Sequence, residues 1–185
     1  MMRLSVLAAT AMSISGAALA DPAGHERLEG PSLPDFAVGY RAANEKQSIR
    51  EEVPRGENVE RWSRMVTTQW MAELTGQITP ADFTRLIGRN MILACPGAQV
   101  TEPRKLSISG RPAAQIQADC PSLTATGRPE SFIMLVVAGE RDMMVRQVAF
   151  RSVPTPDDLE WGDAVLGGSV VCKANEDTPP CDRSD

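Results

Sequence analysis

The sequence predicts an α+β domain in which a mostly antiparallel β-sheet is flanked by two α-helices and held by two disulfides. Short segments in which apolar and polar residues alternate recur between Phe36 and Arg151, and this period of two is typical of half-buried strands. Two segments begin with a Thr-Pro pair followed by an aspartate, which is a pattern of helix N-termini. The chain also contains four cysteines, an even number that favours disulfides in an exported protein.

The first twenty residues have the three parts of a secretory signal peptide. Arg3 supplies a positive region, residues 4–14 an apolar region, and residues 18–20 a small-x-small cleavage signal before Asp21. The apolar region is shorter than the roughly twenty residues that a membrane anchor needs. We therefore predict that residues 1–20 are removed after Ala20 during export, and the short signal favours a bacterial periplasm.

The remaining chain is predicted to form one domain with irregular ends. Residues 21–35 are charged and rich in proline and glycine without apolar periodicity, which favours a flexible leader. Residues 36–173 contain all the predicted strands and helices, and residues 174–185 form a polar tail. This length is sufficient for a single domain with a sizeable core.

The strand predictions follow from alternation and from the turns between segments. Residues 36–41 and 49–53 are expected to form a hairpin. Pro54 to Glu57 breaks the second strand, and Asn58 is placed to cap a single helical turn through Arg61. The segment 131–138 is apolar on both faces, as in a central strand covered on each side. Further strands are expected at residues 63–71, 106–109, 112–119 and 144–151.

The helix predictions rest on N-terminal capping. Thr79 is the expected cap of the first helix, which ends just after Cys95 where Pro96 and Gly97 follow. Thr155 caps the second helix. Its apolar face extends from Trp161 through Val165 to Cys172, but the pair Gly167-Gly168 weakens the helix, so we expect it to end near Leu166.

The cysteines are Cys95, Cys120, Cys172 and Cys181, and three pairings are possible. We expect Cys95 to pair with Cys120 and Cys172 with Cys181, because each bond closes a local loop. Counting by twos places Cys120 on the same strand face as Ile116, pointing inward to the end of the first helix. There is no Cys-x-x-Cys motif, so a thioredoxin-type redox site has little support.

The charge of the chain argues against two classes of partner. The net charge is −5, and the predicted removal of Arg3 makes the mature chain one unit more acidic. This balance disfavours nucleic acid and anionic membrane as main partners. No second apolar segment approaches membrane length, so we predict no transmembrane segment in the mature chain. The oligomeric state is left open.

Few catalytic groups are present. The only histidine, His25, lies in the predicted leader, so a catalytic triad or a histidine-rich metal site would depend on it alone. We therefore predict no cofactor, no metal and no catalytic residues. The alternative is an envelope hydrolase that uses carboxylates without histidine. Glu51 and Glu52 are the obvious pair, but adjacent residues on a strand point to opposite faces.

A third alternative is a copper carrier, since thioether sulfur is a good ligand for Cu(I). Dispersed methionines are more often core residues, and no Met-x-x-Met cluster occurs. The three tryptophans are expected to pack in the core, because the chain has few aromatic residues to supply large apolar side chains. The methionines concerned are Met65, Met71, Met91, Met134, Met143 and Met144.

One polar interruption in an otherwise apolar strand is a candidate ligand site. Thr67, Thr68 and Gln69 lie between Val66 and Trp70. Threonine is also a common strand residue, so a half-exposed sheet explains part of the pattern. The predicted ligand-binding residues are Arg64, Thr67 and Gln69.

The order of these motifs resembles a group of small exported proteobacterial proteins of uncharacterised function. The shared features are the signal peptide, the Pro-x-Gly-Glu turn at residues 54–57 with Trp62, the run 110–121 ending in Cys-Pro, and Trp161 before a cysteine pair. The element order is similar to the Mog1/PsbP-like α/β/α sandwich over most of residues 36–173. This resemblance implies a non-catalytic binding or accessory module for an envelope protein or small ligand, and it implies no catalytic residues.

Overall fold

The computed structural model describes residues 25–173 and Cys181. The predicted signal peptide and the predicted tail other than Cys181 lie outside the described residues. The strands are β1 (Arg27–Glu29), β2 (Phe36–Ala43), β3 (Gln47–Pro54), β4 (Arg64–Met71), β5 (Gln99–Val100), β6 (Arg104–Ile108), β7 (Arg111–Asp119), β8 (Ser131–Ala138), β9 (Met143–Phe150) and β10 (Val170–Cys172), and the helices are α1 (Pro80–Ala94) and α2 (Pro156–Gly167).

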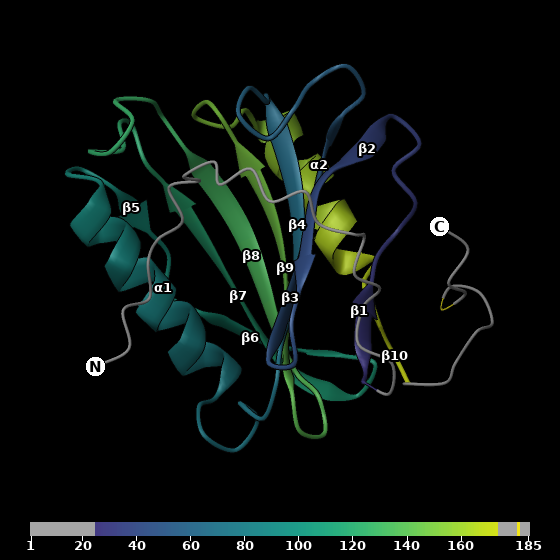
Figure 1. Cartoon of the computed structure of the whole chain (residues 1–185). Helices are drawn as coiled ribbons and strands as arrows, with labels where there is room; N and C mark the ends of the chain where they lie inside the picture. Colours follow the sequence, from purple (N-terminus) through teal and green to yellow (C-terminus); the bar gives the residue numbers. More distant parts are fainter. Residues whose placement is uncertain (1–24, 174–180, 182–185) are drawn as a thin grey trace.

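Eight strands form one antiparallel sheet in the order β2-β3-β4-β9-β8-β7-β5, with β6 also paired to β7. Helix α1 packs against one face of this sheet and α2 against the other (Figure 1). Strands β1 and β10 form a separate two-stranded ribbon whose side chains join the core on the α2 side. The predicted α+β fold with two flanking helices is confirmed.

Strand β8 is buried along its whole length, because both faces of the sheet are covered there. Alternate residues such as Met134 join the core beneath α1 with Phe83, and the others, such as Leu135, join the core beneath α2 with Leu166. The predicted central strand is therefore confirmed, and it separates two hydrophobic cores.

The predicted caps and disulfides are also present. The hydroxyl of Thr79 accepts a hydrogen bond from the Asp82 backbone N–H at the start of α1. At the start of α2, Thr155 and Asp158 form a reciprocal capping box. The disulfides are Cys95–Cys120 and Cys172–Cys181, as expected.

Two local predictions were wrong. Residues 58–61 form a turn and not a helical turn, because the Asn58 side chain accepts the N–H groups of Glu60 and Arg61 and the chain then closes a backbone bridge. An asparagine side chain accepts the same backbone N–H groups in an Asx turn and at a helix N-cap, so the presence of Asn58 in the sequence does not distinguish a turn from a helical turn. The second helix ends at Gly167, close to the expected end near Leu166, so its apolar face does not continue to Cys172, which belongs to β10.

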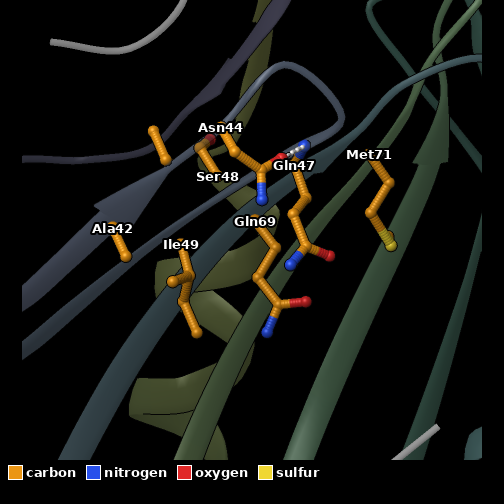
Figure 2. A pocket seen from close by; sticks show the side chains of 8 residues that line it. Ala42, Asn44, Gln47, Ser48, Ile49, Gln69 and Met71 are labelled. Carbon is orange, nitrogen blue, oxygen red and sulfur yellow. Dashed lines mark hydrogen bonds between the residues drawn. The ribbon is translucent and has the colours of Figure 1, made fainter. Parts of the chain in front are cut away.

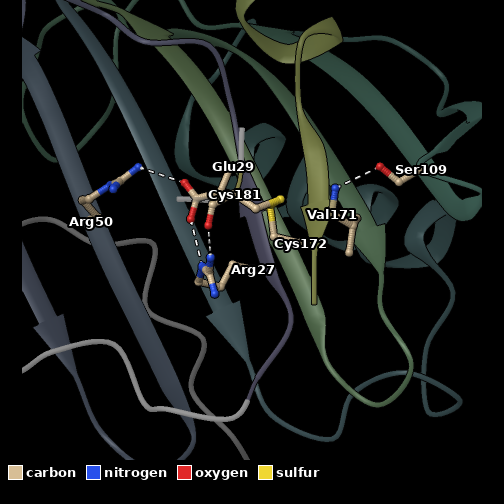
Figure 3. Close-up of a disulfide and its surroundings, with 7 residues drawn as sticks. All are labelled: Arg27, Glu29, Arg50, Ser109, Val171, Cys172 and Cys181. Atoms are coloured by element: carbon tan, nitrogen blue, oxygen red, sulfur yellow. Dashed lines mark hydrogen bonds and ion pairs between the residues drawn. A yellow bond between two sulfur atoms is a disulfide. The ribbon is translucent and has the colours of Figure 1, made fainter. Parts of the chain in front are cut away.

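Part of the predicted flexible leader, residues 27–29, forms strand β1. Strand β1 pairs with β10, and Leu28 is only 3% exposed. Figure 3 shows how the second disulfide supports this strand: the Arg27 guanidinium donates a 2.6 Å hydrogen bond to the Cys181 carbonyl oxygen. A three-residue strand is too short to produce an alternation that sequence analysis recognises.

Candidate functional site

The face of the sheet that carries α1 is only partly covered. Helix α1 packs on β5, β7 and β8, and among the described residues no helix lies over β2, β3 and β4 on this face (Figure 1). Val53 on β3 and Met65 on β4 are still buried in the α1-side core with Trp62. We call the remaining, more exposed part of this face the open half-sheet. It is formed by side chains that alternate with those of the α2 face, namely Tyr40, Ile49, Glu51, Thr67, Gln69 and Gln147.

A hollow of about 140 Å³ lies at the end of the open half-sheet near the β2–β3 hairpin. Figure 2 shows Gln47, Ile49, Gln69 and Met71 along it, so two amides and two aliphatic side chains face the same space. Asn44 fixes the hairpin, because its side-chain oxygen accepts the backbone N–H of Gln47 at 3.0 Å. A hollow of this size suits one side chain or a small chemical group rather than a drug-sized ligand.

The charges of two carboxyl groups, Glu51 and Glu130, also interact on this side of the sheet. Burial raises the pKa of Glu51, and the nearby charge of Glu130 raises it further. Burial also raises the pKa of Glu130, although Arg151 opposes this. The Arg151 guanidinium donates a 2.6 Å hydrogen bond to Glu130 and lies 4.2 Å above the Trp62 ring centroid. Both carboxyls therefore hold a proton at a higher pH than an exposed glutamate does.

The sequence gives no sign that Glu130 approaches Glu51, because Glu130 lies in the irregular segment just before β8, far from Glu51 in the chain. Adjacent Glu52 points to the other face, where its carboxylate lies 3.5 Å from the Arg50 guanidinium. The expected divergence of Glu51 and Glu52 is thus observed. No pattern in the sequence identifies this pair of carboxyl groups, because the period of a strand does not specify which segments become its neighbours.

The structure brings together two of the three predicted ligand-binding residues. Thr67, which is 5% exposed, and Gln69 both belong to the open half-sheet. Arg64 lies on the opposite face, where it is bonded to Asp158 and lies 5.0 Å above the Trp161 ring. Positions 64 and 67 differ by an odd number, so a strand places them on opposite faces.

The single histidine is attached to the folded core. His25 Nδ1 lies 3.1 Å from an Asp142 carboxylate oxygen, and the His25 and Trp70 ring centroids are 4.1 Å apart. Burial alone would raise the pKa of Asp142, but hydrogen bonds from the Glu73 backbone, the Trp70 indole and His25 hold it below its usual range. Within residues 25–173 and 181, no hydroxyl or thiol is hydrogen-bonded to His25, so this contact anchors the N-terminal segment.

The methionines have a packing role. Five of the six lie in the hydrophobic cores, and Met71 packs against one of them. In the described part of the chain, no three His, Cys, Asp or Glu side chains are grouped so that they could hold a metal ion. The described residues also include no helix of the length and apolarity needed to cross a membrane.

No protein-family model and no curated protein matches the chain. Several solved structures are similar to it, among them the following three. LpqN of Mycobacterium tuberculosis, which is involved in cell envelope biogenesis, is 12% identical with a TM-score of 0.44, over 80% of this chain and 84% of LpqN. A Pseudomonas aeruginosa protein of unknown function is 17% identical with a TM-score of 0.45, over 77% and 95% of the two chains.

The third similar structure is the PsbP protein of the cyanobacterium Synechocystis. It is 11% identical with a TM-score of 0.47, over 88% of this chain and 98% of that protein. A PsbP protein is thus among the similar structures. At these identities the likeness concerns the fold alone.

Proposed function

We propose that residues 36–173 form a non-catalytic binding module that holds an envelope partner or a small ligand on the open half-sheet. The observation that carries the proposal is the unequal cover of one sheet face: α1 shields β7 and β8, whereas β3 and β4 present half-buried amide, hydroxyl, carboxyl and aliphatic groups beside a hollow. Binding sites in general combine an apolar lining with a few placed polar groups.

The proposed location is the periplasm, reached through cleavage of the predicted signal peptide after Ala20. Two disulfides support this proposal, since such bonds form and persist in oxidising compartments. The single domain at residues 36–173 and the polar tail are kept as predictions. The structure modifies only the leader, where β1 contributes to the α2-side core.

Site-specific photo-cross-linking in cells that export the protein tests the proposed surface. The cross-linking amino acid p-benzoylphenylalanine replaces Gln69 in the open half-sheet, or Leu93, which is 82% exposed on α1, as the matched control. We expect a discrete adduct from position 69 at several times the yield from position 93, and we expect Gln47→Arg at the rim of the hollow to suppress it. Equal yields at both positions would contradict the proposal.

The second candidate function is an envelope hydrolase that uses carboxylates. The approach of Glu51 and Glu130, with the pKa of each raised, favours this alternative, because a general acid must hold its proton near the working pH. Purified protein would be assayed against cell-wall glycan and ester substrates. Activity that is lost in both Glu51→Gln and Glu130→Gln, with unchanged circular dichroism, would establish the enzyme in place of the binding module.

The copper carrier remains the third alternative. Titration with Cu(I) in the presence of a competing chelator tests it directly. Because the methionines pack in the cores, we expect no transfer of copper from the chelator to the protein.

A further inference from the structure

Within residues 25–173 and Cys181, strand β2 pairs only with β3 and lies at the end of the strand order, so this edge of the large sheet has no further strand there. The strand at the other end, β5, has two residues. Residues 38–41 are exposed, including the apolar side chains of Val38 and Tyr40, which are 48% and 47% exposed. A long edge strand with exposed apolar side chains is able to pair with a further strand.

The edge has two parts. The register between β2 and β3 shifts between Val38 and Tyr40, at Gly39, and such a bulge bends the strand and interrupts its pairing. Residues 40–43 therefore form the regular part of the edge. They continue directly into the hollow, because Ala42, Ala43 and Asn44 line it.

The charge on this part of the edge is unbalanced. Arg41 lies directly opposite Arg50 on β3, and like charges in opposite positions destabilise a sheet. The Arg50 guanidinium is near the carboxylates of Glu52 and Glu29, at 3.5 Å and 3.9 Å. Arg41 is exposed and has no ion pair among the described residues. Arg50 thus already has carboxylate neighbours, and an acidic side chain next to Arg41 would balance the remaining exposed cation.

We infer that residues 40–43 of β2 accept an extended segment of a partner protein, with an acidic side chain beside Arg41 and apolar side chains on either side of it. This inference deepens the proposed function and rests on it. Side chains alternate along a strand, so the acidic group lies on the α2 side and its two neighbours lie beside Tyr40 and Ala42 on the open half-sheet. Pairing of β2 with a second copy fits less well, because it brings two Arg41 side chains close together.

The charge requirement is tested with synthetic peptides and the mature chain. The probe is a fluorescein-labelled eight-residue peptide of alternating valine and threonine with one central glutamate, and the matched peptide carries lysine in its place. We expect the glutamate peptide to bind at least ten times more tightly, as measured by fluorescence anisotropy. Arg41→Glu should reverse the preference and Arg41→Gln should reduce it. Equal binding of the two peptides to the unmodified chain overturns the inference.

The backbone requirement is tested by N-methylation of the peptide. Methyl groups on alternate amides block one hydrogen-bonding edge of an extended peptide and leave the side chains in place. We expect one of the two alternating patterns to weaken binding at least tenfold and the other to leave it unchanged. Amides in residues 40–43 should then gain protection from hydrogen exchange only with the binding peptide. Tight binding of both methylated forms would exclude strand addition.

The outcomes separate this inference from the proposed function. If an adduct forms at position 69 while neither peptide is preferred, the binding module stands and strand addition to β2 fails. If the glutamate peptide pairs with β2 but no adduct forms at position 69, the edge is a binding site and the proposed role of the hollow fails. A concentration-dependent dimer by analytical ultracentrifugation whose formation, without peptide, protects the amides of residues 40–43 from hydrogen exchange would assign the edge to a second copy and overturn the inference.

Discussion

The two halves of the α1-side face differ in chemistry, although both belong to the same antiparallel sheet. One row of neighbouring side chains crosses it from β7 to β2. The apolar end, under α1, includes Ile116 at 1% exposure, and the far end is Tyr40 at 47%. The full row is Ile116, Met134, Gln147, Thr67, Glu51 and Tyr40. The change from apolar to polar falls between β8 and β9.

This difference indicates that the side chains of the open half-sheet suit a solvent-exposed surface and not a hydrophobic core that lacks its covering helix. Apolar area removed from water contributes roughly 25 cal/mol per Å², and a polar group buried without a hydrogen bond costs about 1–3 kcal/mol. Under α1 the row is apolar because a helix excludes water there. Away from α1, Gln147, Glu51 and Gln69 keep contact with solvent, which suits a surface that exchanges water for a ligand.

The largest expected effect comes from the bond that fastens α1 to the sheet. Removal of Cys95–Cys120 as the double variant Cys95→Ala/Cys120→Ala should lower the free energy of unfolding by roughly 3.5 kcal/mol, from the 25-residue separation of the two cysteines. Urea unfolding measures the loss. Either single variant should lose about as much as the double variant, and fully additive losses would contradict a shared bond.

Hydrogen exchange would sharpen the same comparison. Without the first disulfide, amides of α1 should lose protection before those of β3 and β4, because only the covered half depends on the helix. Simultaneous loss of protection in both halves would show that they unfold as one unit.

A smaller effect separates two neighbours within the row. Met134→Ala should cost about 2–3 kcal/mol, because it removes a side chain packed beneath α1. Gln147→Ala, one strand away and half-buried, should change stability by less than about 0.5 kcal/mol. Thermal and urea unfolding of the two variants would check this. Similar losses at both positions would place the boundary between the halves elsewhere.

The smallest effect is a pH dependence at Glu51. Burial and Glu130 raise the pKa of Glu51 above the ordinary 4.5, so the folded state binds its proton more tightly than the unfolded chain. The charged carboxylate therefore opposes folding at a pH above the raised pKa, and the effect disappears below pH 4.5, where both states are protonated. Glu51→Gln should raise the free energy of unfolding at pH 7.5 by less than about 0.5 kcal/mol, because solvent screens a half-exposed group.

Glu52→Gln is the matched control for this prediction. Glu52 lies on the opposite face, near Arg50 and the buried Arg146, whose charged form it supports. Its replacement should therefore lower stability at pH 7.5, opposite in sign to Glu51→Gln. Urea unfolding at pH 4 and pH 7.5 compares the two variants, and a loss of stability in Glu51→Gln at pH 7.5 would refute the assigned cause.

Local chemistry was enough to predict much of the fold. The caps at Thr79 and Thr155, the apolar strand at 131–138 and both disulfides depend on residues that are close in sequence or on a simple period. The separation of Arg64 from Thr67 and Gln69 was also accessible from the same period, since odd spacing changes the face of a strand.

The candidate site was less accessible. Glu130 joins Glu51, and His25 joins Asp142, through contacts between segments that are far apart in the chain. A strand period specifies which residues share a face, but it does not specify which strand becomes the neighbour. The short strands β1 and β10 were missed because their stability comes from tertiary contacts, including the second disulfide, rather than from a repeated pattern.

The sequence by itself determined the longer strands, both helices with their caps, the favoured pairing of the cysteines and the absence of a common catalytic motif, because these depend on local propensity, spacing and composition. Only the tertiary structure decided that α1 covers β7 and β8 and leaves the open half-sheet uncovered, that the charges of Glu51 and Glu130 interact, and that β2 ends the order of the described strands. These features depend on strand order and helix placement, which arise when the whole chain buries its apolar faces together.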